Sequence, residues 1–186
     1  MKGSDPRREE NYNEYLRLLQ DSDYENVTYD EKSGGVSGVH KRHKFSKQEG
    51  AYGMRQGDYE RMVLEVLRNR GHRIVLGAET NMPGLKSFDG FLDDVPMEIK
   101  SIEGSGTWAI STKLRDAEKQ HAQCVVLYFP KEDIYSPLRI SEGIRLFHSG
   151  LGNNHLPGIW RLIVIVQDRL VSDWDKKAAP ILGWQI

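Results

Sequence analysis

The sequence predicts a mixed α/β domain, in which a β-sheet is flanked by helices and the core follows the order helix, three strands, helix, strand, helix, strand, after a β-hairpin. Three observations support this prediction. Apolar residues recur at helical spacing from Tyr59 to Leu67, which indicates an amphipathic helix. The run at 124–129 is apolar throughout, as is typical of a strand buried on both faces. A helical segment precedes this strand, and a crossover of that kind favours parallel pairing with the strand before it.

The segment before the core divides into a polar lead and a hairpin. Residues 1–23 are mostly polar and predict a partly helical, loosely attached lead. Residues 26–29 and 36–39 predict two strands joined by a glycine-rich turn. A basic linker follows, so we expect residues 1–47 to form an extension and residues 48–186 to form the main domain.

The core elements follow in chain order. The first helix begins near Gly57, and Gly71 supplies its C-terminal stop. Strands are predicted at 72–79, 88–92, 97–102, 124–129 and 159–166, with helices at 111–122 and 140–148 between the last three. We expect a closing segment with Trp174 and Trp184 to pack after them.

Composition and charge indicate a soluble globular protein with a basic main part. Of the 186 residues 38% are hydrophobic and 28% charged, and no apolar run approaches the roughly 20 residues of a membrane helix. The N-terminal residues lack the apolar stretch of a secretion signal, so we expect a cytoplasmic protein without a membrane partner. Residues 1–31 hold nine acids and four bases, which leaves 22 bases and 18 acids for the rest. That split favours a nucleic-acid partner.

Two acids and a lysine fall on two neighbouring strands. Alternate side chains of a strand share a face, so Glu98 and Lys100 point the same way and the residue between them points to the opposite layer. Asp89 lies at the start of the preceding strand. Acid-x-Lys triplets also occur at 30–32 and 175–177, but those stand in polar, turn-like surroundings. The sequence therefore predicts a charged site at Asp89, Glu98 and Lys100.

A glutamate of the first core helix is positioned to join this site. At about 100° per residue Glu60 falls within the apolar stripe, whereas Glu65 lies on the opposite, charged side. The element order lets this helix lie against the sheet face that displays the acids. A carboxylate aimed at the core is costly unless it is compensated. A bound cation would compensate Glu60; the alternative is an ion pair with a basic residue at the edge of the stripe.

Carboxylates in this arrangement suit Mg²⁺ or Mn²⁺. Mg²⁺ favours one or two carboxylates with several retained waters, so we expect Asp89 and Glu98 as direct ligands, Glu60 directly or through water, and the carbonyl of Ile99 to complete the shell. Lys100 would orient or help deprotonate the attacking water and stabilise charge on a phosphate. We therefore interpret Glu60, Asp89, Glu98 and Lys100 as the catalytic residues of a phosphodiester hydrolase.

The segment 57–61 with Glu60, then Asp89, then the triplet 98–100, resembles the PD-(D/E)xK nuclease superfamily over roughly residues 50–130. The resemblance implies a restriction-endonuclease-like core whose active site is the four residues above. Ser87 and Phe88 stand where that superfamily expects a proline before the aspartate. The polar lead, basic linker and compact module also resemble toxin domains of contact-dependent inhibition and phage-like systems, several of which are similar to tRNA nucleases. This second resemblance implies an inhibitory immunity protein as partner and delivery into the cytoplasm of a target cell.

Five side chains are candidates for nucleic-acid contacts. Lys41, Arg42 and Lys44 belong to the basic cluster at 40–44, and the resemblance adds Lys113 and Gln120 on the helix 111–122. Solvated surface roles are the alternative for all five. The two histidines of the cluster have no further Cys or His at zinc-ligand spacing.

The sequence thus predicts a metal-dependent endonuclease, in the toxin-type interpretation one that acts on tRNA or other RNA. Two alternatives stay open. One is a DNA nuclease of a phage or mobile element, of resolvase or restriction type. The other is a nucleic-acid-binding module on the same fold that does not catalyse.

Overall fold

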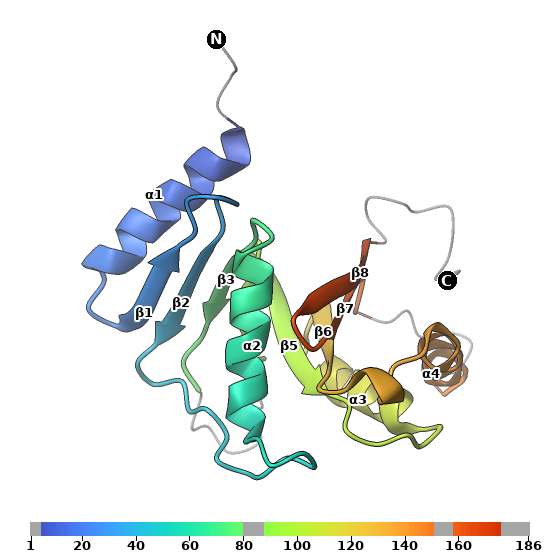
Figure 1. The fold of residues 1–186 in the computed structure, drawn as a ribbon. Coiled ribbons are helices and arrows are strands. Elements are labelled where there is room, and N and C mark those ends of the chain that lie inside the picture. Colours follow the sequence, from blue (N-terminus) through green and yellow to red (C-terminus); the bar gives the residue numbers. More distant parts are fainter. Residues whose placement is uncertain (1–4, 80–87, 151–157, 176–186) are drawn as a thin grey trace.

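The computed structural model describes residues 5–79, 88–150 and 158–175, which form one mixed sheet flanked by helices (Figure 1). The sheet has eight strands, which neighbour one another in chain order. The strands are β1 (Tyr24–Tyr29), β2 (Val36–His40), β3 (Arg73–Leu76), β4 (Gly90–Leu92), β5 (Val95–Ser101), β6 (Cys124–Phe129), β7 (Arg161–Val166) and β8 (Arg169–Asp175). The helices are α1 (Pro6–Gln20), α2 (Gln56–Arg68), α3 (Ala109–Lys119) and α4 (Pro137–Ser149), with a 3-10 turn at Glu132–Ile134.

The predicted fold class and core order are confirmed. After α2, the strands β3, β4 and β5 form an antiparallel meander, and α3 and α4 connect β5, β6 and β7 as parallel neighbours. β8 adds an antiparallel edge strand that contains Trp174, while Trp184 lies outside the described residues. Within the described ranges, no helix is long and apolar enough to cross a membrane.

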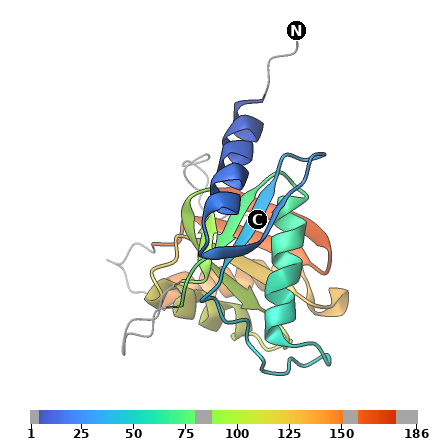
Figure 2. The ribbon, with the colours of Figure 1, turned by 90° about the vertical axis from the view of Figure 1, so that its left-hand side faces the viewer.

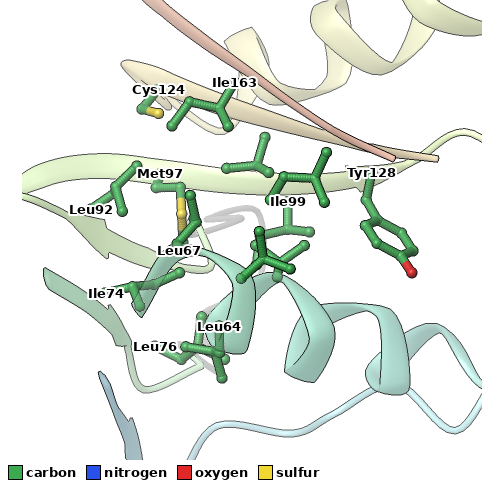
Figure 3. Close-up of a cluster of buried hydrophobic side chains, with 14 of the residues drawn as sticks. Leu64, Leu67, Ile74, Leu76, Leu92, Met97, Ile99, Cys124, Tyr128 and Ile163 are labelled. Carbon is green, nitrogen blue, oxygen red and sulfur yellow. The ribbon is translucent and has the colours of Figure 1, made fainter. Parts of the chain in front are cut away.

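The two faces of the sheet are covered by different helices. α2 packs on one face, where Leu67 lies beside Met97 of β5 and Leu64 beside Leu76 of β3, in the cluster that also contains Ile99 (Figure 3). α3 and α4 pack on the other face, and Figure 2 shows them on the opposite side of the sheet from α2. Since side chains alternate along a strand, Glu98 and Lys100 point towards the α3 face. The expectation that the first core helix lies on the face of these two residues is therefore wrong.

The lead is attached more firmly than expected. Leu18 of α1 is fully buried against Val36 and Val75, a burial that contributes roughly 1.5–3 kcal/mol. The side-chain amide of Asn11 donates to the carbonyls of Gly34 and Gly71 over 2.8 and 3.1 Å. β2 pairs in parallel with β3, so the hairpin extends the main sheet. The expected loose attachment is wrong for α1, and the boundary between residues 47 and 48 stays a prediction.

An ion-pair cluster centred on Asp93 holds the β4–β5 turn to the rest of the sheet. Asp93 accepts hydrogen bonds from the Arg73 N–H at 2.9 Å and from the His72 ring at 2.8 Å, and pairs with Arg7 at 2.9 Å and Arg161 at 3.0 Å. Burial alone would raise the pKa of Asp93, but the His72 hydrogen bond and the surrounding positive charges bring it well below its usual range. The cluster thereby fixes the strands that carry the predicted site.

Candidate active site

Asp89 and Glu98 are held in place by hydrogen bonds between their two strands, at the end of the β4–β5 ladder. Gly90 pairs with Met97, which brings Asp89 opposite Glu98. The N–H of Asp89 donates to Oε2 of Glu98 over 3.0 Å, and the N–H of Ile99 donates to Oδ2 of Asp89 over 2.7 Å. Each carboxylate is therefore oriented by the backbone of the other strand.

Lys100 completes this half of the site from the α3 face. Its ammonium donates to Oε1 of Glu98 and, over 2.8 Å, to Oε1 of Gln120, which directly follows α3. Only 3% of the Glu98 side chain and 15% of the Lys100 side chain are exposed. The structure thus brings Glu98, Lys100 and Gln120 together. Lys113 lies about two helical turns before Gln120 and forms no hydrogen bond or ion pair with a site residue in the described part of the chain.

Glu60 approaches from the other side, through a histidine. Its Oε2 lies 2.8 Å from Nε2 of His43, and Nδ1 of His43 lies 3.2 Å from the carbonyl of Gly77. Both neighbours are acceptors, an arrangement that favours the protonated ring with a donor on each nitrogen. Burial lowers the pKa of His43, but the hydrogen bond and charge of Glu60 outweigh this and raise it above its ordinary value. The open alternative for Glu60, an ion pair with a basic residue, is therefore what the structure contains.

A short chain of contacts links the two halves. Gly77 accepts from His43 through its carbonyl, and its N–H donates to the carbonyl of Asp89 over 2.9 Å. Burial, followed by the negative charges of Glu98 and Glu60, raises the pKa of Asp89 to about 7. Burial also raises the pKa of Glu98, although Lys100 favours its charged form. The charges of the other three predicted catalytic residues, Glu60, Glu98 and Lys100, therefore all act on Asp89.

The donor chemistry of the site fits a hard divalent cation. Asp89 and Glu98 lie together, and burial followed by the negative charges of Glu98 and Glu60 disfavours the charged form of Asp89, which a divalent cation would favour. As they stand, no three His, Cys, Asp or Glu side chains among the described residues are grouped to hold a metal ion. Glu60 is bonded to His43, which leaves Asp89 and Glu98 as the pair for direct ligation. One or two carboxylates are what Mg²⁺ usually takes from a protein. The ligand role of the Ile99 carbonyl stays a prediction.

The basic cluster is anchored next to Glu60. Lys41 and Arg42 follow β2 and are exposed, and Lys44 is exposed directly after the buried His43. In the sequence His43 stands within a basic run, and its contact with Glu60 was not predicted. No local pattern could reveal it, because the two residues are 17 positions apart and meet only in the folded chain.

Comparisons with known proteins place the chain only loosely. No protein-family model matches it, and no curated protein matches its sequence. Among solved structures it is similar to a chain of the "CdiA-CT/CdiI toxin and immunity complex from Burkholderia pseudomallei". The two are 16% identical, the alignment covers 75% of this chain and 98% of the other, and the TM-score is 0.49. The function proposed below rests on the site residues of this chain and not on that likeness.

Proposed function

We propose that this protein is a nuclease that hydrolyses phosphodiester bonds with the help of Mg²⁺ or Mn²⁺. One observation carries the proposal. Lys100 is held by Glu98 and Gln120 on the same strand face as Glu98, and the Glu98 carboxylate also accepts the backbone N–H of Asp89, so that two acids and an ammonium meet at one place. Two adjacent acids beside a fixed ammonium are suited to bind a metal and a phosphate together.

Each side chain has a role in this proposal. Asp89 and Glu98 would hold the ion, with Glu60 contributing through a water molecule. When bound, the ion would polarise the phosphate and lower the pKa of a water. Lys100, charged and oriented by its two partners, would donate hydrogen bonds to the attacking water and to a phosphate oxygen as negative charge develops there. Asp89 is kept in place by the Ile99 N–H, so its second oxygen can face the ion.

His43 acts in this proposal as a positioning residue for Glu60. Its side chain is 5% exposed, and its two hydrogen bonds fix both the ring and the carboxylate. Replacement of His43 by Asn would leave a donor too short to reach both partners. We expect a weaker metal affinity with the site otherwise intact.

A cleavage assay on matched substrates tests the proposal. Purified protein is incubated with single-stranded and duplex DNA, RNA of the same sequence and tRNA, each with Mg²⁺, Mn²⁺ or EDTA. Glu98→Gln is the matched control, because the amide keeps the size of the side chain and removes its charge. We expect metal-dependent cleavage that falls on the order of a hundredfold or more in the variant. Intact substrates under all conditions, or equal cleavage by the variant, would overturn the proposal.

The product pattern also separates the finer interpretations. Preferential cleavage of tRNA would support a toxin-type nuclease and the expectation of an immunity protein. Cleavage of duplex DNA would support a resolvase- or restriction-like enzyme.

A second candidate function is nucleic-acid binding without catalysis. It is favoured by the engagement of Glu60, Asp89 and Glu98 with protein donors, and by the lack of a ready three-residue metal group among the described residues. Binding of an oligonucleotide in EDTA, together with no cleavage in either metal, would establish this candidate.

A further inference from the structure

A basic groove of about 720 Å³ lies beside the Glu60 end of the site. Four cationic side chains and two acidic ones line it, namely Lys44, Lys47, Arg55, Arg61, Asp58 and Glu79. Lys44 directly follows His43, and Arg61 directly follows Glu60. Because His43 and Glu60 are bonded to each other, both walls of the groove are joined to the predicted site.

The groove carries a net positive charge, because four cationic side chains line it against two acidic ones. Asp58 is engaged by the protein, since its Oδ2 accepts from the N–H of Arg55 over 3.1 Å and its Oδ1 lies 3.6 Å from Arg61. In the described ranges of the chain, Lys44, Lys47 and Arg55 have no ion-pair partner, and all three are exposed. Unpaired cations that line a concave surface concentrate anions there.

Arg61 adds a flat surface to this groove. Its guanidinium carbon lies 3.7 Å from the centroid of the Phe45 ring, so that one face rests on the aromatic side chain. The Arg61 side chain is 55% exposed, so much of it is accessible from solvent. Phe45 in turn meets the His43 ring edge to face at 4.9 Å. Guanidinium planes and aromatic rings are the surfaces on which unpaired bases stack.

We propose that this groove binds a single-stranded segment of the substrate next to the bond that is cleaved. Lys44, Lys47 and Arg55 contact its phosphates, and the guanidinium of Arg61 stacks on a base. The volume suits roughly one or two nucleotides and is too small to enclose a duplex. That the bound strand is a substrate rests on the proposed function, but the binding itself needs neither metal nor catalysis.

Salt-dependent binding in EDTA tests the phosphate contacts. The affinity for a fluorescent single-stranded oligonucleotide is measured by anisotropy from 0.05 to 0.5 M salt for wild type and Lys44→Ala/Lys47→Ala. A matched control, Lys32→Ala/Arg145→Ala, removes the same charge from the hairpin turn and from α4. Each phosphate contact contributes about 0.7 to the slope of log K against log salt, so the groove variant should lose about 1.4. If both proteins bind equally at 1 M salt, where the charges are screened, the variant should bind about 25-fold more weakly than wild type at 0.1 M salt. The control should keep the wild-type slope.

Arg61→Lys tests the stacking contact separately. Lysine keeps the charge and loses the planar surface, so binding should weaken at least about fivefold with an unchanged salt slope. Thermal melts by circular dichroism accompany each variant, and if the double variant does not fold, Arg61→Lys alone decides. Wild-type slopes in the folded double variant, wild-type affinity in Arg61→Lys, or no binding by wild type would overturn the groove. If the predicted losses of binding occur while no substrate is cleaved, the groove stands and the proposed nuclease falls. Metal-dependent cleavage with unchanged binding in both variants would refute the groove alone.

Discussion

Asp89→Asn should stabilise the metal-free protein at neutral and alkaline pH. An unfolded chain releases the Asp89 proton near the ordinary pKa of 3.8, whereas burial and then the neighbouring negative charges raise the pKa of the folded state to about 7. Between these values the folded state binds more protons, so the free energy of unfolding falls as pH rises. At 1.36 kcal/mol per pH unit the loss amounts to roughly 4 kcal/mol by pH 8. An asparagine carries no such charge and still accepts the Ile99 N–H.

Urea unfolding in EDTA at pH 4, 6 and 8 measures this difference. The gap between variant and wild type should widen by a few kcal/mol from pH 4 to pH 8, whereas Asp168→Asn in the exposed β7–β8 turn should show no such widening. Addition of Mg²⁺ at pH 8 should then stabilise wild type and leave Asp89→Asn unchanged, because a ligand stabilises only the state that binds it. Parallel stability curves for wild type and Asp89→Asn from pH 4 to pH 8 would refute the electrostatic account of the site.

Three further variants probe the site and its scaffold. Lys100→Gln keeps a hydrogen-bond donor but loses the charge, so metal-dependent cleavage should fall on the order of a hundredfold; a rate within threefold of wild type would contradict its proposed role. Asp93→Asn removes the carboxylate that Arg161, His72 and Arg7 share, while Arg161 keeps its pair with Asp173, and should cost roughly 1–3 kcal/mol in urea unfolding at pH 7. Since the pKa of Asp93 is lowered, that cost should shrink as pH falls below about 4, and a cost independent of pH would argue against the ion-pair cluster. Gly90→Ala would place a methyl carbon 2.2 Å from the carbonyl oxygen of Val75, so its melting temperature should drop by many degrees, while Gly104→Ala, which meets open space, should melt like wild type.

The fold was largely predictable because its signals are local. The residues with helical spacing from Tyr59 to Leu67 lie in a helix, as predicted. The apolar run at 124–129 is a strand with the predicted bounds. β8 was missed, since its polar and apolar residues alternate only weakly at an exposed edge. The attachment of α1 depends on Leu18, whose burial follows from distant strands rather than from its own neighbours.

The candidate site shows the same division between local and distant information. Strand alternation correctly separated Glu98 and Lys100 from Ile99, because the two-residue period is fixed by the backbone. The same period places α2 over Ile99, so Glu60 reaches the site from the opposite face and through His43. That contact joins a linker to a helix, and no periodicity in either segment encodes it.

The order of the strands bears on how the protein is made. Because each strand pairs with the one immediately before it in the chain, the sheet can grow by one strand at a time during synthesis, without waiting for distant segments. The same order creates a hazard. A chain interrupted after β6 would present Cys124–Phe129, a fully apolar strand, as an open edge, and such edges recruit other chains into aggregates. Once β7 has paired with β6, and the exposed, charged β8 with β7, the apolar edge of β6 is no longer available to other chains.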